Sequence, residues 1–155
     1  MKHKFLGVVG GVAIMAGIPA ACGGGGHSST TQSTVAPAPG TAKLIVDGKD
    51  QKVQGPVECP AREGIIDIKI GGPDSGIGAA VTQGDNPVVN YVGVGTFDGV
   101  SIGYLRGVDP TGKADATKNG NTYKISGVAT GRNMTDLANP GPVVSKPFEM
   151  TVTCP

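Results

Sequence analysis

The chain of 155 residues has no tryptophan, three tyrosines, three phenylalanines and two histidines. Both histidines, His3 and His27, lie near the N-terminus. A Ser-His-Asp or Cys-His catalytic group and a histidine-based zinc site are therefore excluded from the rest of the chain. The acidic residues are scattered and do not group with aromatic residues as they do in a glycosidase cleft. We predict that the protein is not an enzyme and uses no cofactor and no metal, with an acid-dependent hydrolase as the disfavoured alternative.

A surplus of charge of one sign is also lacking. The formal net charge is +1, and Lys and Arg are mixed with Asp and Glu along the chain. Nucleic-acid-binding proteins carry a basic patch or stripe that neutralises phosphates, and no such run is present here. The composition therefore predicts no nucleic-acid partner, and it does not indicate an oligomeric state.

No apolar run is long enough to span a bilayer as a helix. The apolar stretch over residues 5–18 has about fourteen residues, whereas a transmembrane helix needs about twenty. Lys2 and Lys4 precede this stretch, and a short apolar run after a basic start is typical of a secretory signal peptide. We predict that residues 1–21 are such a signal.

Cys22 follows the small pair Ala20-Ala21 and precedes a glycine tract, which is the pattern at which bacterial lipoprotein signals are cut. Small residues let a peptidase approach the bond, and the thiol carries diacylglycerol. Pro19 stands where the pattern usually has an aliphatic residue. Each buried CH₂ of an acyl chain contributes about 0.8 kcal/mol, so several chains on Cys22 make a stable anchor. We predict an exported protein, lipid-anchored at the cell membrane or envelope and facing outward. An ordinary signal peptide with an incidental cysteine is the alternative.

Residues 22–42 contain four consecutive glycines followed by serine, threonine and proline, and little that can form a core. Segments of this composition stay disordered. We predict a disordered linker between the anchor and a domain. Serine and threonine beside proline also suit O-glycosylation, and the composition fits a glycosylated linker and an undecorated spacer equally well.

The remainder of the chain, residues 43–155, has turn signals rich in Gly, Asp, Asn and Pro about every eight to twelve residues, with apolar alternation between them. That spacing is typical of all-β sandwiches and barrels. We predict one mostly β domain, a compact antiparallel sandwich or open barrel of short strands. Every second residue is apolar within Ile66–Ile70 and within Phe148–Cys154, which predicts one buried face on each strand.

Asn119-Gly120 predicts a hairpin, because both central residues of a two-residue type I′ turn need positive φ. This turn would place Asp115 opposite Lys124 on a polar face. On the apolar face, small alanines would lie opposite larger side chains, namely Ala114 and Ala116 opposite Ile125 and Tyr123.

Three cysteines in an exported protein leave one unpaired, and lipidation of Cys22 accounts for it. Cys59 and Cys154 both fall on apolar faces of predicted strands. Export places them outside the reducing cytosol, so we predict a Cys59–Cys154 disulfide.

Glycine-rich segments such as Gly76–Gly78 and Gly93–Gly95 lack the strand-turn-helix context of phosphate loops. Glycine inside a strand marks a bulge or a close approach of neighbouring chains, and we expect these roles here. A core of glycine and valine with few large side chains also raises an alternative function, a carrier of an apolar ligand or glycolipid held between the sheets.

Several segments, in this order and spacing, resemble the mycobacterial LpqH-type lipoprotein antigen family, and the similarity runs through essentially the whole chain after the signal. Beside Cys22 and the Ser/Thr/Pro linker, they are Ile45–Gln51, Val57–Cys59, Gly71-Gly72, Gly99–Tyr104, Ala114–Gly120, Tyr123–Gly127 and Val152–Cys154.

The resemblance implies a triacylated envelope lipoprotein that is surface-exposed, immunogenic and O-glycosylated on linker threonines. It also implies an adhesin that engages a host Toll-like receptor through the acylated N-terminus. Cys22 would then hold the lipid, and Cys59 and Cys154 match the family's two domain cysteines. The candidate glycan sites are Thr30, Thr31 and Thr34.

Overall fold

A computed structural model describes residues 39–108 and 110–155, which form eleven β-strands. The strands are β1 (Thr41–Val46), β2 (Lys49–Asp50), β3 (Val57–Glu58), β4 (Ala61–Arg62), β5 (Ile65–Ile70), β6 (Ile77–Thr82), β7 (Val89–Phe97), β8 (Val100–Leu105), β9 (Lys113–Asn119), β10 (Thr122–Arg132) and β11 (Val143–Thr153). Within these ranges, no helix has the length and apolar character needed to span a membrane.

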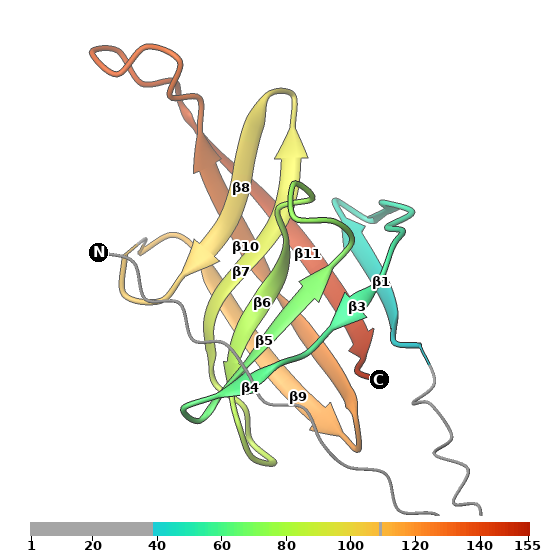
Figure 1. Cartoon of the computed structure of the whole chain (residues 1–155). Coiled ribbons are helices and arrows are strands. Elements are labelled where there is room, and N and C mark those ends of the chain that lie inside the picture. Colours follow the sequence, from blue (N-terminus) through green and yellow to red (C-terminus); the bar gives the residue numbers. More distant parts are fainter. Residues whose placement is uncertain (1–38, 109) are drawn as a thin grey trace, which may run out of the picture. The chain divides into compact units, whose positions relative to one another are not determined.

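The strands belong to one antiparallel sheet that curls around its own core (Figure 1). The order along the sheet is β2-β1-β11-β10-β8-β7-β6-β5-β3, with β4 paired to β5 and β9 paired to β10. The predicted mostly β, antiparallel fold is confirmed. Of the two forms predicted, the single curled sheet corresponds to the open barrel.

The two ends of the sheet meet without a continuous hydrogen-bonded ladder. Gly40, just before β1, packs against β3, because a Cβ on it would come within 2.8 Å of the Val57 Cβ. Strand β3 is the last in the sheet order, whereas β1 is the second. The curl therefore brings the first and last parts of the sheet together, and side chains rather than main-chain hydrogen bonds close the core at this seam.

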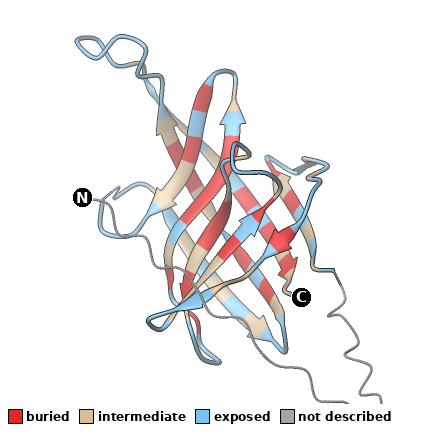
Figure 2. Cartoon of the chain, in the orientation of Figure 1, coloured by how far each residue is buried: buried red, intermediate tan, exposed pale blue. Residues whose placement is uncertain are grey.

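The core lies on the inner face of the curled sheet (Figure 2). Burial alternates along the strands, as the period of two in a strand requires. The predicted faces are confirmed: Ile68 and Ile70 are buried on β5, as are Phe148, Met150 and Val152 on β11. The other large inner residues are Leu44, Val46, Val57, Val81, Val89, Val92, Val94, Val100, Ile102, Tyr123 and Ile125.

Each end of the inner face carries a lysine above an aromatic ring. The Lys146 Nζ lies 5.9 Å from the centre of the Phe97 ring and 2.6 Å from the Asp47 Oδ2. The Lys118 Nζ lies 5.8 Å from the centre of the Tyr123 ring. The aliphatic stems of these lysines cover apolar surface at the margins of the core, while their ammonium groups stay in contact with water.

The β9–β10 hairpin has a different register from the predicted one. Asn119 pairs with Thr122, so Gly120 and Asn121 are the two loop residues. Of these two loop residues, only Gly120 has the left-handed backbone conformation, with a φ of 57°. The backbone N–H of Cys154 donates to the Asn121 carbonyl at 2.9 Å, which ties the loop to the end of β11.

The predicted Asp115–Lys124 pair is therefore wrong, since these residues lie opposite Ser126 and Thr117 respectively. Ala116 does lie opposite Ile125, but Tyr123 lies opposite Lys118. The actual register is shifted by two residues, and a shift of two leaves every side chain on its predicted face. Hydrophobic alternation therefore could not distinguish the two registers.

The connection between β10 and β11 is a long exposed loop. Asp136 organises it: its carboxylate accepts hydrogen bonds from the Asn139 side chain at 3.2 Å and from the Ala138 backbone N–H at 2.9 Å. These hydrogen bonds, the Asn139 side chain first, hold the pKa of Asp136 below its usual value. Leu137 at the tip is 77% exposed, so the loop adds nothing to the core.

Candidate functional site: a disulfide seam and an outer groove

Several residues singled out by the sequence lie outside the described part of the chain. These are the lipid attachment residue Cys22 and the candidate glycan sites Thr30, Thr31 and Thr34. Their roles stay predictions, as do the boundaries of the signal, the linker and the domain.

The structure contains the predicted Cys59–Cys154 disulfide, with an S–S distance of 2.01 Å and a Cα–Cα distance of 5.9 Å. Cys59 follows β3 and Cys154 follows β11. Since β3 ends the sheet order and β11 lies near its start, the bond crosses the seam of the curled sheet. It covalently joins edges that the hydrogen-bonded ladder leaves apart.

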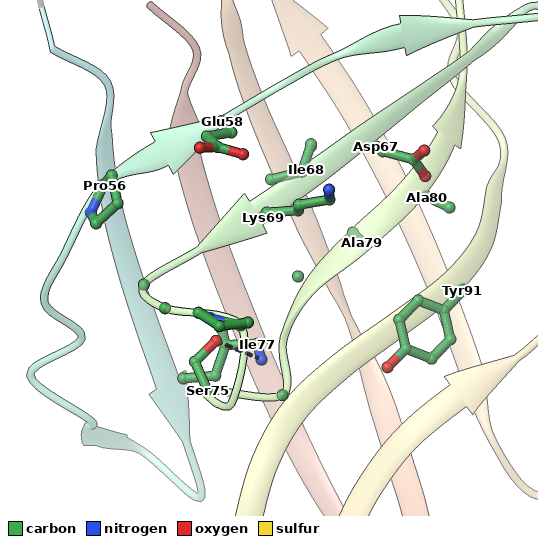
Figure 3. Close-up of a pocket in the computed structure, with 15 residues that line it drawn as sticks. Pro56, Glu58, Asp67, Ile68, Lys69, Ser75, Ile77, Ala79, Ala80 and Tyr91 are labelled. Carbon is green, nitrogen blue, oxygen red and sulfur yellow. Dashed lines mark hydrogen bonds between the residues drawn. The ribbon is translucent and has the colours of Figure 1, made fainter. Parts of the chain in front are cut away.

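A groove of about 580 Å³ lies on the outer face of the sheet, opposite the core (Figure 3). Pockets of about 300–1,000 Å³ are the usual size for small-molecule sites. Strands β5, β6 and β7 form its base, and the β5–β6 loop and residues 56–58 form its margins. We call it the outer groove.

Strand pairing explains the shape of the outer groove. In one row across the sheet, Asp67 lies opposite Ala80, which lies opposite Tyr91. In the next row, Lys69 lies opposite Gly78 on β6, and Glu58 pairs with Lys69 from the other side. Small residues on β6 thus separate a charged wall on β3 and β5 from an aromatic wall on β7 (Figure 3).

Gly78 keeps the floor of the outer groove at the level of the main chain, and Gly93 does the same for β7 beside it. A Cβ on Gly78 would lie 2.4 Å from the carbonyl oxygen of Ile68, and one on Gly93 would lie 2.4 Å from that of Gly76. Gly95, with a φ of 101°, lies at a register shift between β7 and β8. The expected roles in close approach and bulges are therefore confirmed for these glycines.

Gly93 also creates the place where the Tyr91 ring rests. A Cβ on Gly93 would come within 2.5 Å of the Tyr91 hydroxyl oxygen and 3.3 Å of its Cζ. The ring therefore lies over the glycine along the strand, an arrangement by which aromatic side chains cover glycines in sheets. Tyr91 nevertheless remains 44% exposed, so part of the ring faces solvent.

The β5–β6 loop closes one end of the outer groove and is firmly held. The Ser75 hydroxyl donates to the Ile70 carbonyl at 2.6 Å and accepts from the Ile77 N–H at 3.2 Å. The Gly71 N–H donates to the Pro56 carbonyl at 2.9 Å. This end wall is therefore fixed without any ligand.

The charged side chains of the outer groove are unpaired within the described part of the chain. Among the residues that the structure describes, no ion pair and no side-chain hydrogen bond engages Glu58, Asp67 or Lys69. Glu58 and Lys69 are exposed and Asp67 is partly buried. The wall thus offers a ligand two carboxylates as hydrogen-bond acceptors and one ammonium group as a donor.

Metal binding has no support from the geometry. Over residues 39–108 and 110–155, no three His, Cys, Asp or Glu side chains come together as a metal site requires. Asp50 in β2 accepts the N–H of Lys52 at 2.9 Å, and this hydrogen bond is the main cause of its lowered pKa.

Sequence reasoning missed the outer groove. Tyr91, Asp67 and Glu58 are far apart in the chain, and the search for acids grouped with aromatic residues found none. The signal that could have found them is alternation: Asp67 and Lys69 occupy outward positions on β5, beside the glycine-rich β6 and β7.

Comparison with known proteins identifies the family of the chain. The family model for the Mycobacterium 19 kDa lipoprotein antigen matches residues 35–154. Lipoprotein LpqH of Mycobacterium avium is 50% identical over 112 residues, which cover 72% of this chain and 67% of that protein. Lipoprotein LpqH of Mycobacterium tuberculosis H37Rv is 48% identical over 120 residues, covering 76% of this chain and 73% of that protein. The chain therefore belongs to the Mycobacterium 19 kDa lipoprotein antigen family.

Proposed function

We propose that the protein is exported and anchored by acyl chains on Cys22 to the cell membrane or envelope. In this proposal residues 1–21 are the signal, residues 22–42 are a flexible linker, and residues 43–155 are the domain that is displayed outward. The observation that carries the proposal is the lipoprotein pattern at Cys22 directly upstream of a domain of a lipoprotein antigen family.

The displayed domain acts without catalysis in this proposal, as an antigen and adhesin. Support comes from the sequence, in which both histidines precede residue 39, and from the family description, which names an antigen and no enzyme. Contact with a host innate receptor is proposed for the acylated N-terminus, because acyl chains are the part of a lipoprotein that an apolar receptor cleft can bind.

Replacement Cys22→Ser tests the anchor. The variant should leave the membrane fraction and lose metabolic labelling with palmitate, since the serine hydroxyl does not accept the thioether-linked lipid. Its Cys59–Cys154 disulfide should still form, which shows that the domain folds and serves as the control. Membrane retention and labelling equal to those of the unmodified chain would refute the proposal.

The same variant tests receptor engagement. Purified acylated protein should activate a reporter cell that carries a host Toll-like receptor, and the Cys22→Ser protein should lose that signal. Adhesion to host cells, measured in parallel, shows whether the domain alone contributes. Equal receptor activation by the two proteins would contradict a role for the acyl chains.

Linker glycosylation has its own test. Intact-mass spectrometry of protein from its native envelope should show hexose additions, which disappear when the three candidate threonines are replaced by alanine. An unmodified mass would establish an undecorated spacer. The residues to replace are Thr30, Thr31 and Thr34.

A carrier of an apolar ligand or glycolipid is the second candidate, and the outer groove is the observation that favours it. The position differs from the one expected, because the groove lies outside the sheet and not in the core. Ala80, Pro73 and the ring of Tyr91 supply apolar lining. Native mass spectrometry of protein taken from the envelope should then show a bound lipid, and its absence would dismiss this candidate.

A further inference from the structure

We propose that the outer groove is a carbohydrate-binding site for neutral sugar rings, with Tyr91 as its stacking platform. Anchoring at Cys22 does not require such a site, so the inference goes beyond the proposed display function. It rests on the shape of the groove, on the exposure of one aromatic ring, and on the chemistry of the opposing wall.

The aromatic wall has the form that sugar recognition needs. One side of a pyranose ring presents C–H groups with partial positive charge, and these pack against the electron-rich face of an aromatic ring. Tyr91 is 44% exposed, and its ring is positioned by Gly93 beneath it rather than by a packed neighbour above. Tyr91 therefore presents a flat surface to a ligand in the groove.

The opposing wall supplies the hydrogen bonds. Sugar hydroxyls both donate and accept, so they match carboxylates and an ammonium group together. Asp67 stands two strands from Tyr91 in the same row of the sheet, about 10 Å away at the usual strand spacing. Lys69 and Glu58 extend the polar wall along the next row. A ring lying over Ala80 and Gly78 would thus contact Tyr91 on one side and charged groups on the other (Figure 3).

The same charges argue against other ligands. Two carboxylates and one ammonium group give the wall a net negative charge, which repels phosphates and acidic sugars. An acyl chain would displace water from these unpaired charges and offer no hydrogen bonds in return, at a large cost, so of a glycolipid it is the sugar and not the acyl chain that fits this wall. A neutral, hydroxyl-rich ring satisfies the charged groups and the aromatic face at once.

The groove is also formed in advance. Ser75 and the Gly71–Pro56 hydrogen bond hold the end wall, and the floor is the main chain of a sheet. A rigid site loses less entropy when a ligand binds. Weak but measurable binding of short oligosaccharides, with dissociation constants of about 0.1–1 mM, is therefore expected.

The test uses the whole mature chain with Cys22→Ser, so that lipidation does not affect the result. Maltotriose, cellotriose and mannotriose are titrated in turn while ¹H–¹⁵N NMR spectra are recorded. Binding by at least one of them should shift the signals of Lys69, Gly78, Ala80 and Tyr91. No shift with any trisaccharide, together with none for the alkyl glycoside described below, would overturn the proposal.

Variants separate stacking from general surface effects. Tyr91→Ala should weaken the binding about tenfold or more, whereas Tyr91→Phe, which keeps the ring, should stay within about threefold. Asp67→Asn should weaken it about three- to tenfold. Leu105→Ala is the control, since Leu105 lies directly opposite Tyr91 on β8, is 49% exposed, and does not line the groove. If Tyr91→Ala bound the sugar with full affinity and its circular dichroism were unchanged, the proposed stacking role of Tyr91 would be overturned.

Two further probes distinguish the possible sources of the sugar and other ligand classes. Dodecyl maltoside below its micelle concentration tests a sugar carried on a lipid, and cis-parinaric acid tests an acyl chain alone. Groove shifts with the glycoside but not with the fatty acid support sugar recognition, whether or not the free trisaccharide binds. Groove shifts with the fatty acid and with no sugar would overturn it.

Discussion

Strands β5, β6 and β7 present two contrasting faces. On the inner face, Ile68 and Val92 are almost fully buried, 2% and 0% exposed, in a continuous apolar core. On the outer face, the same strands carry Asp67, the small Ala80 and the exposed Tyr91. One segment of sheet therefore stabilises the fold with one set of side chains and forms a groove with the other.

The difference shows how a protein with few aromatic residues can build both a core and a site. The inner face is filled by aliphatic side chains from every part of the sheet. The outer groove owes its depth to a missing side chain, since Gly78 leaves the main chain bare between two walls. Stability and binding should therefore respond to different substitutions, which the following predictions test.

The largest effect is expected where the inner face is closed covalently. Replacing Cys59 and Cys154 together by serine should lower the free energy of unfolding by about 4 kcal/mol, because the bond closes a loop with a sequence separation of 95 residues. Urea unfolding followed by circular dichroism measures this. Reduced unmodified protein should match the double variant, and a loss below about 1 kcal/mol would show that side-chain packing alone closes the seam.

Substitutions at two neighbouring residues of β5 compare how much each face of the sheet contributes to stability. Ile68→Ala should cost about 3 kcal/mol, since it deletes three carbons from a residue that is 2% exposed. Lys69→Ala, one residue on and on the outer face, should change stability by less than about 0.5 kcal/mol. Both values follow from the urea midpoints of unfolding, provided that the free energy of unfolding depends on urea concentration with the same slope in each variant. Equal costs for the two variants would refute the division of roles between the faces.

The glycine floor is expected to contribute an intermediate effect. Gly78→Ala should cost about 1–3 kcal/mol, because its Cβ would stand 2.4 Å from a main-chain oxygen and the strands must shift. Gly72→Ala is the matched control: a Cβ there meets nothing within 4 Å, so the change should be close to neutral. Thermal unfolding of both variants measures the difference. A neutral Gly78→Ala would mean that the floor tolerates side chains.

Much of the inner face could be predicted from the sequence. Alternation in Ile66–Ile70 and Phe148–Cys154 identified the buried side of β5 and β11, since a strand has a period of two. Cys59 and Cys154 were the two cysteines left once Cys22 was assigned to lipid, so their pairing also followed.

The outer groove could not be predicted in the same way, because it depends on register. Alternation assigns a face but allows shifts of two residues, as the β9–β10 hairpin shows. The alignment of Tyr91 with Ala80 and Asp67 depends further on the β6–β7 register, which shifts between Ala80 and Val81. No glycine marks the shift at Ala80/Val81, in contrast to the one at Gly93/Gly95, so the local residue pattern did not indicate it.

The smallest effect is expected at the edge of the inner face, where Asp47 binds Lys146 at 2.6 Å. Asp47 has a φ of 50°, and Asn tolerates this left-handed conformation equally well, so Asp47→Asn removes charge without straining the turn. The Lys146 side chain is 22% exposed and that of Asp47 44% exposed, so solvent screens the pair and its loss should cost only about 0.5 kcal/mol.

Salt separates this ion pair from packing. In 1 M NaCl the Debye length is about 3 Å, so dissolved ions weaken the attraction between exposed charges. The cost of Asp47→Asn should therefore fall toward zero. Asp115→Asn is the control, since Asp115 is an exposed residue on β9 that forms no ion pair with any other described residue. Unfolding midpoints at low and high salt give both values. A cost that persists in high salt would show that Asp47 holds the turn through its shape, and that the core margin does not depend on the charge.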